Sequence, residues 1–146
     1  MRVNEIFGSI EGEGIRSGYP AAFIRLYGCN LNCSYCDTRY SCVGNDFKEM
    51  SIDEIVNEIQ RLSFERITLT GGEPLIHEDV DELIHRLTSL GYEVNIETNG
   101  SVYIGPYLDN PKVIITADYK SISSGASEFM DKHNLIALRP QDVLKF

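Results

Sequence analysis

The chain has 146 residues, 42% hydrophobic and 24% charged, so it can bury a sizeable core and does not have the composition of a disordered or fibrous protein. Thirteen basic and 22 acidic side chains give a formal net charge of -9, which argues against nucleic acid and against a polybasic membrane anchor as partners. No segment has the character of a signal peptide or a transmembrane helix. We therefore expect one cytoplasmic domain over residues 1–146.

Short apolar runs and amphipathic segments alternate along the chain. Ser51 to Glu54 has the form of a capping box and opens a predicted helix, and a second predicted helix runs from Val80 to Leu87 and ends near Gly91. The alternation predicts parallel βαβ units in an α/β sheet or partial barrel. Five strands are predicted, over Val3–Phe7, Ala21–Tyr27, Arg66–Leu69, Tyr92–Ile96 and Val113–Thr116.

Two segments lack a regular period. Residues 28–47 contain all four cysteines, and residues 120–127 are polar and rich in Ser and Gly. A loop of about 20 residues inside a compact domain is usually functional or disordered, and the cysteines favour a functional loop. The last residues, Val143 to Phe146, have the character of the start of another strand.

Cys29, Cys33 and Cys36 form a Cys-x3-Cys-x2-Cys motif. In a reducing compartment such spacing favours metal binding or catalysis over disulfides. Iron-sulfur clusters are held by thiolates, normally four, so three protein ligands leave one iron open, as a catalytic centre requires. We interpret Cys42, six residues later, as a bystander. The alternative is a structural zinc site in which Cys42 supplies the fourth thiolate.

The segment from Thr70 to Pro74 reads Thr-Gly-Gly-Glu-Pro and directly follows a predicted strand. Two glycines let the backbone approach a ligand closely, and ligands of α/β sheets bind at the carboxyl ends of strands. Together with the cysteine motif, in which Tyr35 precedes the last cysteine, this segment resembles the signature of the radical S-adenosylmethionine (SAM) superfamily. The resemblance implies one 4Fe-4S cluster with SAM bound to its open iron, on a partial (β/α) barrel of mostly parallel strands.

A narrower resemblance covers most of the chain, from about Val3 to Gly125. Over this range the chain resembles the 7-carboxy-7-deazaguanine synthase family of queuosine and archaeosine precursor biosynthesis. The resemblance implies a lyase that converts 6-carboxy-5,6,7,8-tetrahydropterin to 7-carboxy-7-deazaguanine with loss of ammonia. It rests on five separated segments in the same order, Ile6–Gly14, Phe23–Asn30, Cys36–Thr38, Glu97–Gly100 and Asp118–Lys120, the last followed by Ser123–Gly125.

The same resemblance implies roles for individual residues, and it assigns no catalytic residue beyond the cluster and SAM. Thr38 is expected to bind Mg2+, a cation that prefers oxygen ligands. Arg25 is expected to receive the substrate carboxylate, because a guanidinium matches a carboxylate in geometry. The cluster ligands would be Cys29, Cys33 and Cys36; the SAM-binding residues Tyr35, Cys36, Asp37, Gly72, Glu73, Asp118, Tyr119 and Lys120; and the substrate-binding residues Ile10, Glu11, Gly12, Glu13, Arg25 and Thr70.

The expected partners are the pterin substrate, an external electron donor such as flavodoxin or ferredoxin, and a second subunit in a homodimer. Chains of this family commonly continue for tens of residues past the point where this sequence stops, so we expect the C-terminal sheet elements to be short or missing. Two other functions stay open at this point. One is another small radical SAM enzyme, such as a glycyl-radical-enzyme activase, and the other is a zinc-binding interaction module.

Overall fold

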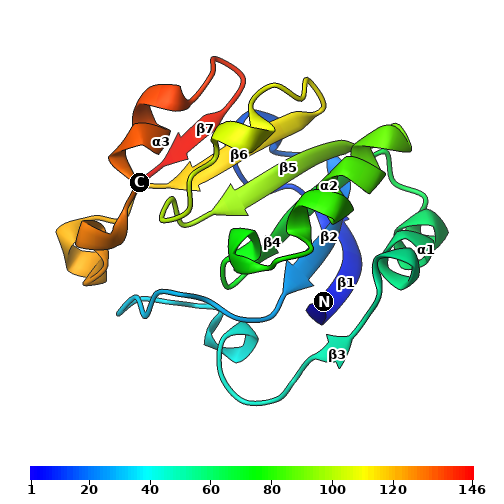
Figure 1. Ribbon diagram of the computed structural model, residues 1–146, viewed down its shortest axis with the longest axis horizontal. Coiled ribbons are helices and arrows are strands. Elements are labelled where there is room, and N and C mark those ends of the chain that lie inside the picture. The colour runs from blue at the N-terminus through cyan, green and yellow to red at the C-terminus, as the bar shows by residue number, and fades with distance from the viewer.

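The computed structural model describes residues 1–146 and contains one seven-stranded sheet with helices on one side (Figure 1). The strand order is β3-β1-β2-β4-β5-β6-β7. Strands β2 and β4 to β7 run parallel, whereas β1 is antiparallel to both of its neighbours. The strands are β1 (Arg2–Ile10), β2 (Pro20–Leu26), β3 (Lys48–Glu49), β4 (Arg66–Gly71), β5 (Glu93–Thr98), β6 (Val113–Asp118) and β7 (Val143–Lys145).

Three α-helices accompany the sheet: α1 (Ile52–Leu62), α2 (Val80–Ser89) and α3 (Lys132–Ala137). The predicted capping box of α1 is confirmed, because the Glu54 amide donates to the Ser51 hydroxyl and the Ser51 amide donates to the Glu54 carboxylate. Helix α2 ends where predicted, with Gly91 following it at a φ of 102°. The five predicted strands and the parallel α/β architecture are confirmed, and the direction of β1 was not predicted.

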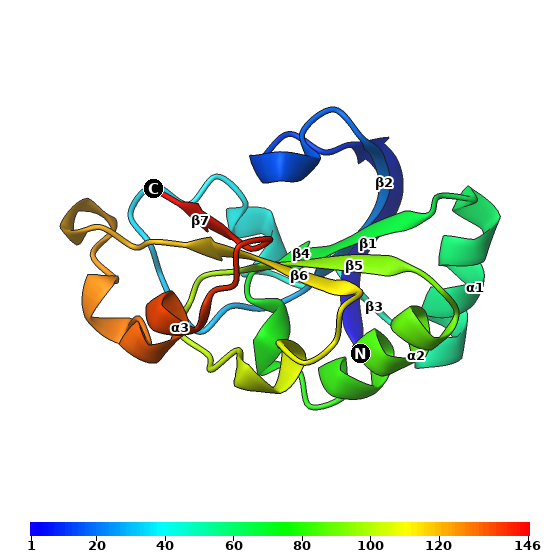
Figure 2. The ribbon, with the colours of Figure 1, turned by 90° about the horizontal axis from the view of Figure 1, so that it is seen from above.

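The hydrophobic core lies between the sheet and the helices that cover one of its faces (Figure 2). Side chains alternate between the two faces of a strand, so every second residue of β4, β5 and β6 points into this layer. The core contains Ile67, Leu69, Val94, Ile96, Val113 and Ile115 from these strands, Ile24 and Leu26 from β2, and Ile55, Ile59, Leu83 and Leu87 from the helices.

The other face of the sheet is polar and is partly covered by the segment that connects β1 to β2, with the short 3-10 helix η1 (Gly14–Arg16) (Figure 2). The Glu11 carboxylate accepts a hydrogen bond from the Thr68 hydroxyl. Arg16 is buried and forms ion pairs with Glu93 at 3.3 Å and Glu11 at 3.8 Å. These contacts hold the β1–β2 connection over the sheet, as in a partial barrel.

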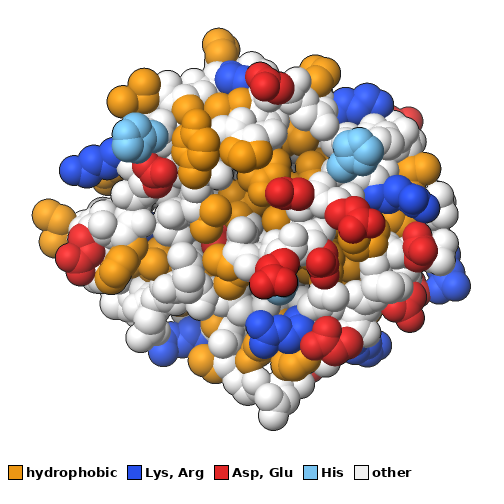
Figure 3. All heavy atoms as spheres, viewed as in Figure 1, with side chains coloured by type: hydrophobic (Ala, Val, Ile, Leu, Met, Phe, Trp, Pro, Cys, Tyr) orange, Lys and Arg blue, Asp and Glu red, His pale blue; other side chains and the backbone are white.

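The predicted C-terminal strand is confirmed as β7, which pairs in parallel with β6 at the edge of the sheet. None of the helices has the length and apolar character needed to cross a membrane. Acidic side chains are frequent over the half of the molecule that carries α1 and α2 (Figure 3).

The end of β4 lies against the start of the cysteine loop with no space for a side chain. A Cβ atom added to Gly72 would stand 2.2 Å from the Gly28 carbonyl oxygen. We predict that Gly72→Ala lowers the free energy of unfolding by about 1–3 kcal/mol, the usual cost of overpacking. Gly12→Ala is the matched control, because nothing lies within 4 Å of its Cβ position. Chemical denaturation of both variants measures the difference, and equal stability would contradict the close packing.

Candidate functional site

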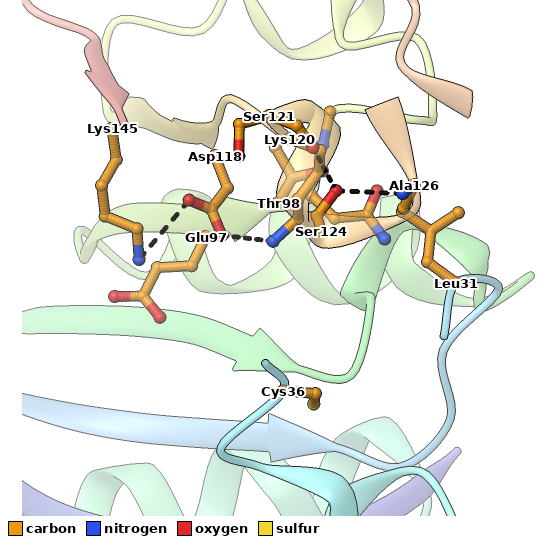
Figure 4. A network of polar contacts seen from close by, with 12 residues as sticks. Leu31, Cys36, Glu97, Thr98, Asp118, Lys120, Ser121, Ser124, Ala126 and Lys145 are labelled. Carbon is orange, nitrogen blue, oxygen red and sulfur yellow. Dashed lines mark hydrogen bonds and ion pairs between the residues drawn. The ribbon is translucent and has the colours of Figure 1, made fainter. Parts of the chain in front are cut away.

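A cavity of about 600 Å³ opens at the edge of the sheet where β2, β4, β5 and β6 end. Parallel strands bring their carboxyl ends to one edge, so residues far apart in sequence meet there. The loop after β2 forms one wall, and the segment after β6 forms the opposite wall. Figure 4 shows Cys36 on the loop across an open space from Asp118 and Lys120.

All four cysteines are free thiols and all four line this cavity. The Leu31 amide donates to the Cys29 sulfur at 3.4 Å, and the Asn99 side-chain amide donates to it at 3.7 Å. Burial raises the pKa of Cys29, and Cys33 is the most buried of the four thiols. Sulfur ligands that accept N–H hydrogen bonds are typical of iron-sulfur sites.

The three predicted cluster ligands, Cys29, Cys33 and Cys36, share the wall of one cavity. No three His, Cys, Asp or Glu side chains stand close enough together to hold a single metal ion. In a 4Fe-4S cluster each thiolate binds a different iron, so the sulfurs of such a site surround a larger body than one ion. Three thiols on the wall of one cavity are compatible with such a cluster.

Most of the residues predicted to bind SAM line the cavity. Lys120 is buried, and its ammonium lies 2.5 Å from the Asp118 carboxylate and 5.8 Å from the centre of the Tyr35 ring. Tyr119 and Glu73 are not in the lining, because the Tyr119 ring packs on Phe146 and Glu73 is fully buried. The predicted set that does line the cavity is Tyr35, Cys36, Asp37, Gly72, Asp118 and Lys120.

The buried Glu73 carboxylate ties the end of β4 to the end of β5. It accepts hydrogen bonds from the Asn99 amide at 2.6 Å, the Thr98 hydroxyl at 2.9 Å and the Leu75 amide at 3.1 Å. Burial nevertheless raises the pKa of Glu73 to about 7, because water cannot solvate its charge. In this structure Glu73 positions the cavity wall and does not touch the open space.

The residues predicted to bind substrate divide into two groups. Glu13, Arg25 and Thr70 line the cavity. Ile10, Glu11 and Gly12 lie outside the lining, because Ile10 and Gly12 are exposed and the buried Glu11 carboxylate is turned to Thr68 and Arg16.

The three lining residues of this group already have polar partners. The Arg25 guanidinium donates to the Glu5 carboxylate at 2.7 Å. The Thr70 hydroxyl donates to Glu97 at 2.7 Å, and the Glu13 carboxylate pairs with Lys145 at 2.9 Å. Each partner is a charged side chain that a bound anion or amine can replace. The cavity therefore presents two exchangeable ion pairs and one exchangeable hydrogen bond.

Several lining residues were not predicted, and the most informative are Glu97, Asn99 and Lys145. Glu97 is mostly buried at the end of β5, and burial raises its pKa. The Lys145 ammonium lies 2.9 Å from Glu13 and 3.9 Å from Asp118. Glu97 and Asn99 belong to Glu97–Gly100, one of the segments on which the family resemblance rests. The sequence therefore contained a signal that could have identified these two as site residues. The position of Lys145 depends on the pairing of β7, which the sequence does not reveal.

Thr38, the predicted Mg2+ ligand, also lines the cavity. Its hydroxyl lies 3.8 Å from the Cys36 sulfur, and its carbonyl accepts hydrogen bonds from the Ser41 amide and hydroxyl at 3.0 and 2.8 Å. The carbonyl is therefore used within the loop, whereas the hydroxyl has the long contact with the Cys36 sulfur.

The raised pKa of Glu73 predicts a pH-dependent stability. Folded protein keeps the Glu73 proton up to about pH 7, whereas an unfolded chain releases it near the ordinary value of 4.5. The free energy of unfolding should therefore fall as the pH rises between those values, and Glu73→Gln should remove this part of the slope. Urea denaturation from about pH 4.5 to about pH 8 measures it, with Glu82→Gln on exposed α2 surface as control. An unchanged slope in Glu73→Gln would refute the assignment.

The sequence and the structure both have known relatives. Residues 23–131 match the Radical SAM superfamily. The 7-carboxy-7-deazaguanine synthase of Methanospirillum hungatei is 45% identical over 148 residues, covering 100% of this chain and 60% of the relative. The enzyme of that name from Clostridium acetobutylicum is 40% identical over 148 residues, covering 99% and 67%.

The crystal structure of QueE from Escherichia coli superposes with a TM-score of 0.76 at 27% identity, covering 94% of this chain and 67% of that one. This chain thus spans about three fifths to two thirds of the length of these relatives. The matched superfamily region contains the cysteine motif and the glycine pair, so both resemblances drawn from the sequence are confirmed. The chain belongs to the 7-carboxy-7-deazaguanine synthase family of the radical SAM superfamily.

Proposed function

We propose that this chain converts 6-carboxy-5,6,7,8-tetrahydropterin to 7-carboxy-7-deazaguanine and ammonia. The observation that carries the proposal is one cavity with the cysteine motif on one wall and Arg25, Glu13 and Thr70 beside it. Relatives that span more residues than this chain bear the name 7-carboxy-7-deazaguanine synthase, which supports the same reaction.

Radical SAM proteins use a 4Fe-4S cluster and SAM. Cys29, Cys33 and Cys36 would hold the cluster here, since all three line the cavity. When bound, these groups supply an electron, from an external donor such as flavodoxin or ferredoxin, and a SAM-derived radical that takes hydrogen from the substrate. Asp118 and Lys120 form a paired anion and cation on the opposite wall, which suits the zwitterionic methionine part of SAM.

Arg25 would bind the substrate carboxylate by exchanging its present partner Glu5 for it, through a charge-assisted pair. Glu13 would accept hydrogen bonds from the amino and ring N–H groups of the pterin. Glu11 lies outside the cavity and supports this arrangement, because its hydrogen bond from Thr68 fixes the segment that carries Glu13 to the sheet. Thr70 would orient Glu97 at the floor of the same space.

The reaction is tested with protein reconstituted anaerobically with iron and sulfide, then given SAM, Mg2+, a reductant and 6-carboxytetrahydropterin. We expect 7-carboxy-7-deazaguanine and ammonia in equal amounts, measured by chromatography and mass spectrometry. Cys33→Ala is the matched control and should lose both the cluster absorbance and the product, because its sulfur is a ligand. Release of 5′-deoxyadenosine without the deazaguanine product would contradict the proposed substrate.

Thr38 is tested through the Mg2+ response. Thr38→Val removes the hydroxyl and keeps the shape of the side chain, so we expect a rise of about tenfold or more in the Mg2+ concentration that half-saturates turnover. Thr38→Ser retains the hydroxyl and should respond like the wild type. Iron content should be equal in all three proteins. An unchanged Mg2+ response in Thr38→Val would remove Thr38 from the metal site.

A further inference from the structure

Asn99 follows the end of β5, and its side chain contacts a predicted cluster ligand on the cysteine loop. The side-chain amide donates to the Cys29 sulfur at 3.7 Å and to the Asn30 side-chain oxygen at 3.1 Å. The Cys29 sulfur also accepts from the Leu31 amide at 3.4 Å. It therefore has one backbone donor from its own loop and one side-chain donor from a strand end 70 residues away.

The orientation of the Asn99 side-chain amide is fixed by its own turn. The Ser101 backbone amide donates to the Asn99 side-chain oxygen at 2.9 Å, so the NH2 group is directed to Cys29 and Asn30. The Asn99 backbone amide donates to the buried Glu73 carboxylate at 2.6 Å, and only 7% of the Asn99 surface is exposed. The fold itself therefore holds the donor toward the sulfur.

The turn after β5 does not need the NH2 group of Asn99. An aspartate could accept the same bond from the Ser101 amide, and the bond to Glu73 comes from the backbone. The asparagine adds a neutral side chain with N–H donors, and one of these donors is directed at the sulfur of a predicted cluster ligand. Hydrogen bonds to ligand sulfurs are among the factors that set the reduction potential of an iron-sulfur cluster.

We propose that Asn99 raises the reduction potential of the cluster through its hydrogen bond to Cys29. The inference rests on the cluster assignment of the proposed function and not on the identity of the substrate. Reduction adds one electron from the external donor, and the ligand sulfurs share the added negative charge. An N–H group directed at one of these sulfurs stabilises the reduced form more than the oxidised form. Asn99 therefore makes the cluster easier to reduce.

The test compares the midpoint potential of reconstituted wild type with that of Asn99→Leu, which has a side chain of similar size without an N–H donor. Redox titration without SAM, followed by absorbance, measures both. We expect a lower potential in Asn99→Leu, by about tenfold in the reduction equilibrium, or about 59 mV for one electron. Asn30→Leu is the matched control, because the Asn30 side chain bonds to Asn99 and Ser101 and not to the sulfur. Its potential should equal that of wild type.

A second readout detects the hydrogen bond itself and needs only wild-type protein. The protein is made with asparagine that carries 15N in its side chain alone, and the reduced cluster is studied by pulsed electron paramagnetic resonance. We expect a 15N coupling to the cluster, because the Asn99 amide nitrogen is joined to a ligand sulfur through its hydrogen. The coupling should persist in Asn30→Leu and vanish in Asn99→Leu.

An unchanged potential in Asn99→Leu, an equal shift in both variants, or the absence of a 15N coupling in wild type would each overturn the proposal. Where Asn99→Leu fails to fold or to load iron, the coupling in wild type decides. If wild type loads zinc or no iron, the cluster assignment of the proposed function fails, and this inference fails with it. Both readouts are taken without substrate, so they decide the role of Asn99 even where no deazaguanine product is formed.

Discussion

The geometry of the cavity depends on the hydrogen bonds of Glu73. Its amide donates to the Gly28 carbonyl at 2.8 Å, which attaches the end of β4 to the start of the cysteine loop, and its carboxylate binds the backbone and side chain at the end of β5. Glu73 thus connects the end of β4, the end of β5 and the start of the loop that carries Cys29. The connection carries a cost, because the effect of burial on the Glu73 pKa outweighs that of the hydrogen bonds and of the Lys120 charge. The fully buried Glu73 therefore fixes the backbone at the ends of β4 and β5 in spite of this cost.

The separation of core and site follows from the period of two along the parallel strands. In β4 and β5, Ile67, Leu69, Val94 and Ile96 enter the helical layer, while the intervening polar residues face the partial barrel. One face therefore supplies the hydrophobic stabilisation, and the other can hold charged and hydrogen-bonding groups without weakening the core. The site is built at the end of this polar face, where strand ends and loops leave open space.

Local patterns were sufficient to predict the helix with its capping box, the five strands and the functional character of the cysteine loop. They were insufficient for β1, because the predicted strand bounds leave residues 8–20 as the connection, long enough for a parallel crossover. The observed connection, residues 11–19, is too short for one. The role of Glu11 was not accessible either, because its partner Thr68 is distant in sequence. Residues joined only by tertiary contacts, such as Lys145 and Glu13, leave no periodic signal.

Lys145 stands between two regions of the cavity, with Glu13 on one side and Asp118 on the other. Asp118 also pairs with Lys120 at 2.5 Å, so Lys145 is the second and more distant cation beside it. Any molecule that draws the Lys145 ammonium toward itself weakens the attraction felt by the more distant carboxylate, and any molecule that neutralises one carboxylate frees the lysine for the other. Any such coupling is reciprocal, because thermodynamic linkage makes each region change the affinity of the other by the same factor. Through Lys145, the short edge strand β7 thus connects a residue predicted to bind substrate, Glu13, with one predicted to bind SAM, Asp118.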